Sequence, residues 1–128
     1  MTDVEVTIRT TVNSTECIEK VERAVRNVLG EIKLESTNQG DVIILESRSK
    51  GLEALSHLRD LLRRMRIRDA AHALFTKNAQ ENILSFGLNK QAAYTNRVSF
   101  SHSRKAPLGS IQITLEGDAA SAIRFLCK

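Results

Sequence analysis

The sequence predicts an α+β fold in which helices cover one face of a mostly antiparallel sheet. Segments of alternating apolar and polar residues occur as a hairpin and as three consecutive strands, instead of alternating regularly with helices. The segments between them repeat apolar residues at helical spacing. The predicted order is β-α-β-β-α-α-β-β-β-α, and a sheet covered on one face leaves its other face for solvent, a second subunit or RNA.

The chain has the length and composition of one globular domain. It has 128 residues, and no linker, repeat or low-complexity segment divides it, so we expect a single α+β domain over residues 1–128. Hydrophobic residues make up 41% and charged residues 27%, which is typical of soluble proteins. Aromatic residues make up only 4%, so the core should be aliphatic and few rings can stack on bases.

The first predicted elements are a strand and a helix. Residues 4–12 alternate between apolar and polar side chains, which predicts a half-buried strand that ends near Val12. Asn13 and Glu16 have the spacing of a capping box, so we expect a helix to begin at Asn13 and to end at Gly30. Its buried stripe is formed by the apolar residues at helical spacing, Ile18, Val21, Val25 and Val28.

A hairpin and two further helices follow. Residues 32–35 and 42–45 are strand-like, and residues 38–41 supply turn chemistry between them. A second helix is expected over residues 49–66, and Asp69 is expected to cap a shorter third helix. The apolar stripe of the second helix is Leu55, Leu58, Leu62 and Met65.

The last third of the chain returns to the period of two that is typical of strands. Residues 84–88, 98–100 and 111–115 are predicted to form three strands. Residues 103–109 form the loop before the third of these strands and contain the only proline. Residues 117 and 118, glycine and aspartate, should open a final helix.

Motifs of catalysis, metal binding and membrane insertion are missing from the sequence. There is no His-Glu-x-x-His, no pair of cysteine ligands and no glycine-rich phosphate loop, so we expect no enzyme activity, metal or cofactor. Cys17 and Cys127 are expected to be free thiols, with a bridge between the first and last helices as the alternative. Without a signal peptide or a membrane-spanning run, the protein is expected to be cytoplasmic.

Five arginines lie in the ten-residue stretch 59–68, at the end of the second predicted helix. The net charge of +4 favours anionic partners but is equally compatible with a merely soluble basic protein. Arginine presents a planar fork of donors that matches phosphate, so we expect the cluster to contact RNA phosphates. On a helical wheel three of the five form a ridge at i, i+4 and i+7 beside the apolar stripe, while the other two project elsewhere. The ridge is Arg59, Arg63 and Arg66, and the other two are Arg64 and Arg68.

The alternative interpretation of the arginine cluster is a solvated helix face. Asp60 would then pair with Arg64, and other arginines would lie along the edge of the sheet. The remaining candidate phosphate contacts are basic residues in later loops, namely Lys90, Arg97, Arg104 and Lys105.

The segment Asn89-Lys90-Gln91 groups amide and ammonium donors next to two alanines. It is interpreted either as a ligand site or as a loop whose amides satisfy the local backbone, and the second reading is favoured. Tyr94 is the one ring near these groups that could stack on a base, although half-buried packing is the more common fate of such a ring.

Three stretches carry a family resemblance, namely residues 15–27, the string Leu-Asn-Lys-Gln-Ala-Ala at 88–93, which is the most specific, and Pro-Leu-Gly at 107–109. They resemble an archaeal protein family of unassigned function that is labelled RNA-binding. The resemblance covers nearly the whole chain. Members of this family resemble the large-subunit ribosomal protein that binds 5S ribosomal RNA, so it implies a ribosomal-protein-like α+β fold with an antiparallel sheet. The segment Asn13-Ser-Thr-Glu-Cys17 stands where Pro-Thr-Glu-Asp is expected, and Ser110 stands where a second proline is expected. No binding residues carry over.

The leading hypothesis is a non-enzymatic, cytoplasmic RNA-binding domain of a thermophilic archaeon that works near the ribosome or in RNA processing. It would contact phosphates through its arginines and recognise RNA by shape, because rings are few. One alternative is a protein-interaction module or homodimer whose arginines pair with a partner's acidic residues. Another is a small-molecule binder at residues 89–91, which would need a closed pocket there.

Overall fold

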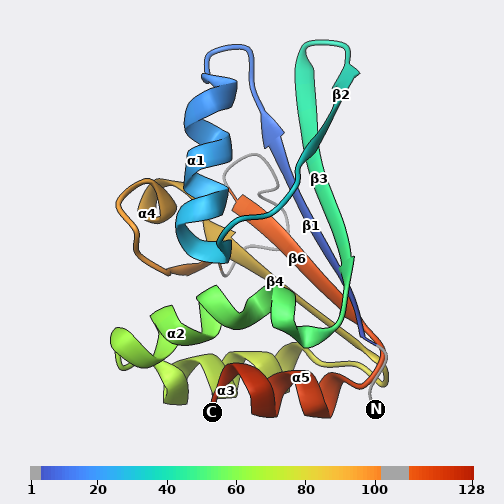
Figure 1. Ribbon diagram of the computed structural model, residues 1–128, viewed down its shortest axis with the longest axis vertical. Coiled ribbons are helices and arrows are strands. Elements are labelled where there is room, and N and C mark those ends of the chain that lie inside the picture. Colours follow the sequence, from blue (N-terminus) through green and yellow to red (C-terminus); the bar gives the residue numbers. More distant parts are fainter. Residues whose placement is uncertain (1–3, 102–109) are drawn as a thin grey trace.

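A six-stranded antiparallel sheet organises the molecule, and its helices pack on one face, as the sequence predicts (Figure 1). The computed structural model describes residues 4–101 and 110–128. The order across the sheet is β2-β3-β1-β6-β4-β5. The strands are β1 (Glu5–Val12), β2 (Glu35–Gln39), β3 (Val42–Lys50), β4 (Ile83–Asn89), β5 (Phe100–Ser101) and β6 (Ser110–Glu116). The helices are α1 (Ile18–Leu29), the 3₁₀ turn η1 (Leu52–Leu55), α2 (Ser56–Arg64), α3 (Arg68–Asn78), α4 (Lys90–Tyr94) and α5 (Ala119–Leu126).

The register of the strands places their buried residues on one face. Ile8 of β1 lies opposite Ser47 of β3 and Ile113 of β6, and Ile113 lies opposite Phe86 of β4. All four residues are buried, whereas Arg9, the neighbour of Ile8, is exposed on the other face. Helices α1, α2, α3 and α5 therefore cover an apolar layer and leave the second face of the sheet polar.

The core is mainly aliphatic, with one cluster of three rings. Phe75 of α3 lies 4.7 Å from Phe86 and 5.5 Å from Phe100 between ring centroids, in tilted and edge-on arrangements. Such geometry is favourable for aromatic pairs. Phe75 and Phe86 are buried and Phe100 is partly buried, so three of the four phenylalanines are engaged in packing.

The β2–β3 hairpin forms one edge of the sheet. All five residues of β2 are exposed, and β2 pairs only with β3 in the described sheet. Gly40 turns the chain with a φ of 64°, a conformation that favours glycine. The hairpin reaches the end of the sheet opposite α2, α3 and α5 (Figure 1).

Helix α1 begins later than predicted. The Glu16 carboxylate accepts the backbone N–H of Asn13 at 3.0 Å, which is the contact that the capping-box pattern predicts. This contact closes a turn ahead of the helix, and the helix itself begins at Ile18 after Cys17. Its end is confirmed, because the N–H of Gly30 donates to the carbonyl oxygen of Arg26.

The predicted second helix over residues 49–66 is wrong at both ends. Strand β3 extends to Lys50, and α2 ends at Arg64. Arg66 has a φ of 58°, so the chain bends at this residue. No glycine or proline at this position indicates the bend in the sequence. Helix α3 then begins at Arg68, and Asp69 lies in its first turn rather than at the cap.

Three elements in the last third of the chain test the predictions made from local sequence. The five-residue helix α4 replaces the expected connection, and its cap is the Asn89 side chain, which accepts the N–H of Ala92 at 3.0 Å. The expected strand 98–100 is reduced to β5. The final helix is confirmed, with Asp118 accepting the N–H of Ser121 at 3.1 Å. Hydrogen bonds from Ser121 lower the pKa of that carboxyl group.

Candidate nucleic-acid interface

The arginine-bearing segment turns a corner instead of following one helix. Arg64 is the last residue of α2, Arg66 lies in the bend, and Arg68 is the first residue of α3. All three are exposed. The expected ridge of Arg59, Arg63 and Arg66 is therefore not formed, because Arg66 lies beyond the end of the helix.

A second segment brings another arginine to this corner. The backbone N–H of Val98 donates to the sulfur of Met65 at 3.4 Å, and Val98 is buried. The loop that follows α4 thereby contacts the junction between α2 and α3. Arg97 precedes Val98 and is exposed. We call Arg64, Arg66, Arg68 and Arg97 the arginine junction.

Residues of the arginine junction lack carboxylate partners in the part of the chain that the structure describes. Within residues 4–101 and 110–128, no ion pair joins Arg64, Arg66 or Arg97 to an acidic side chain. Burial raises the pKa of the Cys127 thiol, and the charge of the nearby Arg68 partly offsets this rise. Guanidinium groups that are exposed and unpaired can form bidentate contacts with phosphate oxygens.

Arg59 contacts helix α5, and Arg63 contacts Lys128 just beyond that helix. The guanidinium of Arg59 lies 4.7 Å from the ring centroid of Phe125, which is a cation–π contact. Its Nε lies 3.5 Å from Asp60, so this pair takes the place of the Asp60–Arg64 pair considered from the sequence. Arg63 Nη2 donates to the carbonyl oxygen of Lys128 at 3.0 Å. These two arginines fasten α5 to α2.

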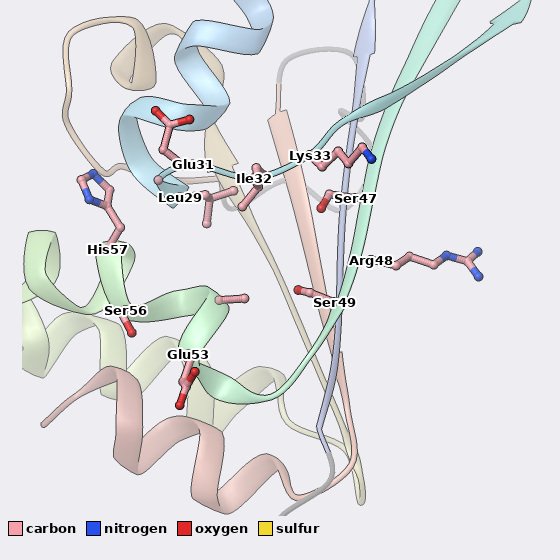
Figure 2. Close-up of a pocket in the computed structure, with 12 residues that line it drawn as sticks. Leu29, Glu31, Ile32, Lys33, Ser47, Arg48, Ser49, Glu53, Ser56 and His57 are labelled. Atoms are coloured by element: carbon pink, nitrogen blue, oxygen red, sulfur yellow. The ribbon is translucent and has the colours of Figure 1, made fainter.

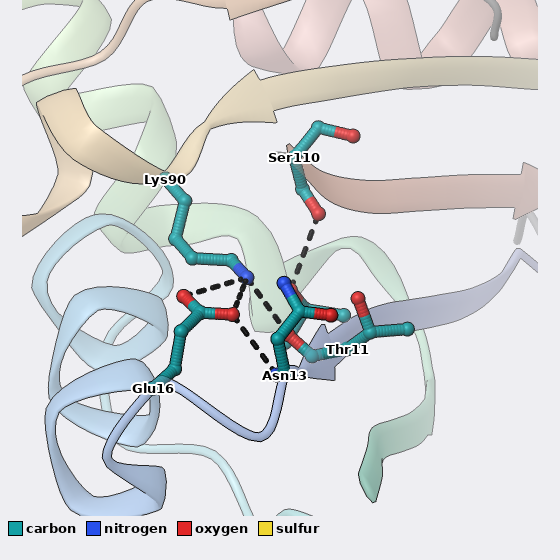
Figure 3. A network of polar contacts seen from close by, with 6 residues as sticks. Thr11, Asn13, Glu16, Lys90 and Ser110 are labelled. Carbon is teal, nitrogen blue, oxygen red and sulfur yellow. Dashed lines mark hydrogen bonds and ion pairs between the residues drawn. The ribbon is translucent and has the colours of Figure 1, made fainter. Parts of the chain in front are cut away.

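Lys90 has a different role from the phosphate contact expected from the sequence. Its side chain is buried, and Nζ donates to the carbonyl oxygen of Thr11 at 2.8 Å (Figure 3). Nζ also contacts the two carboxylate oxygens of Glu16 at 3.1 and 3.2 Å. Because Glu16 accepts the N–H of Asn13 as well, this network joins α4 to the end of β1 and to the turn before α1.

The donors at residues 89–91 do not converge on one ligand. Asn89 caps α4, Lys90 pairs with Glu16, and Gln91 is exposed. Tyr94 is partly buried near the same network. Burial raises the pKa of the Tyr94 hydroxyl most, and the negative charge of Glu16 raises it further.

The remaining predictions concern two basic residues, the cysteines, metal ligands and membrane-spanning helices. Arg104 and Lys105 lie outside the described residues. Cys17 and Cys127 are free thiols. In the described part of the chain, no three His, Cys, Asp or Glu side chains are grouped as metal ligands, and no helix has the length and apolar character to cross a bilayer.

Residue spacing marked the arginine segment as a candidate but did not indicate which arginines contact other parts of the protein. The contacts of Arg59 with Phe125 and of Lys90 with Glu16 join residues 66 and 74 positions apart. Residue spacing carries no signal for such pairs. Asn89 was a usable signal for α4, because asparagine is a preferred N-cap.

Comparison with known proteins places this geometry in a family. A family model described as RNA binding matches residues 5–117. A UPF0201 protein of Aeropyrum pernix is 40% identical over 115 residues, which span 88% of this chain and 77% of that protein. A UPF0201 protein of Thermococcus kodakarensis is 35% identical over 111 residues, 87% and 79% of the two chains. The crystal structure of the UPF0201 protein from Methanococcus jannaschii matches with a TM-score of 0.84 and 30% identity, over 97% of this chain and 99% of that one.

Proposed function

The chain belongs to the archaeal UPF0201 family, whose model is described as RNA binding, and from this premise we propose that it binds RNA phosphates through the arginine junction. One observation carries the proposal. The contact between Met65 and Val98 brings exposed arginines from two distant segments to one corner of the molecule. No carboxylate of the described chain neutralises Arg64, Arg66 or Arg97 there.

The chemistry of the arginine junction suits a backbone contact. Each guanidinium offers two parallel donors to a phosphate, and several such groups held on packed segments fix the position of the RNA. Three phenylalanines pack in or against the core and the fourth lies under Arg59, so stacking on bases is a minor contribution. The arginine junction therefore recognises the shape of an RNA backbone rather than the identity of its bases.

Other parts of the proposal rest on the sequence. Arg104 and Lys105, which lie outside the described residues, are proposed as further phosphate contacts because of their charge. The protein works in the cytoplasm as a binding module without catalysis. A structured ribosomal RNA is the first target to test, in keeping with the resemblance to the ribosomal protein that binds 5S RNA.

The test is a salt titration of RNA binding. The variant combines Arg64→Gln, Arg66→Gln and Arg97→Gln, and fluorescence anisotropy measures its affinity for labelled 5S ribosomal RNA at several salt concentrations. Each lost phosphate contact reduces the slope of log K against log salt by about 0.7 to 0.9, so the slope should fall by about 2 to 3. Affinity should fall most at low salt.

A matched control removes the same charge from the polar face of the sheet. Its substitutions are Arg9→Gln, Arg48→Gln and Lys50→Gln, at exposed positions of β1 and β3. This variant should keep most of the slope. An equal fall in both variants would show that net charge alone matters, and absence of binding by the natural chain would overturn the proposal.

A protein partner is the competing explanation for the exposed arginines. Light scattering over a range of protein concentrations distinguishes it. A mass that rises with concentration and falls back in the variant of the arginine junction, together with no RNA binding, would favour a homodimer.

A further inference from the structure

A pocket opens beside the N-terminal end of α2, away from the arginine junction (Figure 2). It lies between the end of α1, the segment that follows it, β3 and the η1–α2 turn, and its volume is about 490 Å³. Small-molecule sites in proteins commonly occupy about 300 to 1,000 Å³. The residues that matter for its chemistry are Leu29, Ile32, Ser47, Ser49, Ala54 and His57.

The interior of the pocket combines apolar walls with hydroxyl groups on one side. Leu29 and Ile32 project into the space from α1 and the segment after it, and the hydroxyls of Ser47 and Ser49 face it from β3 (Figure 2). Ser47 is only 7% exposed, and its hydroxyl borders the pocket together with that of Ser49. A hydroxyl can both donate and accept a hydrogen bond, so the polar edge of a ligand fits this wall.

Charged side chains stand at the rim and leave the interior neutral. Lys33 and Arg48 are directed away from the space in Figure 2, and both are exposed. Glu31 and Glu53 are exposed as well. An ionised group in the interior would have no counter-charge, whereas a neutral, flat ring with a polar edge would meet apolar walls and two hydroxyls. A nucleobase has this chemistry.

His57, which lines the pocket, connects it to the arginine junction along helix α2. His57 Nε2 lies 2.9 Å from the carbonyl oxygen of Asn27, which fixes α2 against α1. Arg64 follows His57 by seven residues, so the two lie on the same side of α2, separated by about 10 Å along its axis. A short single-stranded segment that contacts Arg64 with a phosphate therefore reaches the pocket.

We propose that this pocket binds a neutral nucleobase of a single-stranded RNA segment whose phosphates contact the arginine junction. The inference rests on the proposed function for the source of the base. It assigns phosphate binding to one end of α2 and base binding to the other. The same chemistry would accept a free nucleoside, and the experiment separates the two sources.

The first arm uses adenosine, guanosine, cytidine and uridine, which carry no phosphate. Amide chemical shifts of the full chain are followed by NMR during each titration. At least one nucleoside should shift the signals of Ser47, Ser49 and Ala54. Ser47→Ala should weaken its binding about fivefold to tenfold, the effect of one hydrogen bond. Ala54→Phe should abolish binding by filling the pocket, and Arg64→Gln/Arg66→Gln/Arg97→Gln should leave it unchanged.

The second arm measures a single-stranded RNA oligomer and a duplex of the same length. Ala54→Phe and Ser47→Ala should weaken binding of the oligomer, leave binding of the duplex unchanged and preserve the salt slope of both. If nucleosides cause no shifts at the pocket and neither variant affects the oligomer, the inference is overturned. RNA binding that still depends on the arginine junction would then leave the proposed function standing.

The base pocket could also be supported while RNA binding by the arginine junction is not. Nucleosides that shift the pocket signals in a chain that binds no RNA would support the base site, with a free nucleoside as its ligand, and would overturn the RNA-binding proposal. Shifts confined to residues outside the pocket would overturn the base site.

Discussion

Lys90 and Arg97 carry the same charge seven residues apart, and the fold places them in opposite environments. The ammonium of Lys90 is buried against the oxygens of Thr11 and Glu16, whereas Arg97 is exposed next to the arginine junction. Both were expected to contact phosphate. The comparison teaches that a cation becomes available to a ligand only where the fold supplies no acceptors of its own.

The difference follows from the number of acceptors within reach. An ammonium has three donors, and Lys90 meets a carbonyl and two carboxylate oxygens. Burial of a charge is tolerated only with such partners. Arg97 lies after the end of α4, where its backbone N–H donates to the carbonyl of Ala92 and its side chain extends from an exposed residue.

The largest effect should come from Lys90→Met. This change keeps most of the side-chain volume but leaves the partly buried Glu16 carboxylate and the Thr11 carbonyl without their donor. Loss of one partner of a buried pair should lower the free energy of unfolding by about 3 kcal/mol. Urea denaturation measures it. Arg97→Met is the matched control and should change stability by less than about 0.5 kcal/mol. Equal losses of stability in the two variants would contradict the different roles of Lys90 and Arg97.

A smaller effect is expected for Arg59→Ala. Arg59 loses its contact with Phe125, so the free energy of unfolding should fall by about 1 kcal/mol. Arg64→Ala, five residues away on the same helix, should keep its stability and instead reduce the salt slope of RNA binding by about 0.7 to 0.9. The comparison fails if Arg59→Ala proves neutral in urea while Arg64→Ala destabilises the protein.

The smallest effect concerns the hydroxyl of Tyr94 beside the Lys90 network. Its pKa lies above the ordinary value of 10.0, because of burial first and of Glu16 second. The folded state therefore favours the neutral phenol. This contribution to stability is complete below about pH 10 and is lost as the pH rises through the folded-state pKa.

Tyr94 is the only tyrosine, so ultraviolet titration of its phenolate reads this pKa directly. The folded chain should titrate at higher pH than the chain in urea, and Tyr94→Phe should remove this part of the alkaline loss of stability. A folded-state pKa at or below the value in urea would contradict the described network.

Much of the fold could be predicted because its patterns are long. The alternation in β1, β4 and β6 and the apolar stripe of α1 each extend over several residues that share one environment. The bend at Arg66 could not be predicted, since an arginine at positive φ carries no turn signal. Helix α4 is too short for periodicity to show.

The site could be predicted only as a set of candidates. The concentration of arginines between residues 59 and 68 marked a segment, and exposure of four of them agrees with a surface role. Their separation into arginines that fasten α5 and arginines that remain unpaired depends on Phe125, Lys128 and the Met65–Val98 contact. These partners come into contact with the segment only in the folded chain. The Met65–Val98 contact likewise places Arg97 beside the segment.

The exposed β2–β3 hairpin supplies an experimental handle. Its tip at residues 38–41 is exposed, and it lies at the end of the sheet opposite α2 (Figure 1). Exposed loop tips accept insertions well. A biotinylation tag inserted at Gly40 would therefore tether the protein to a sensor surface with α2 directed into the flow, so that RNA association and dissociation rates could be recorded without labelling either binding region.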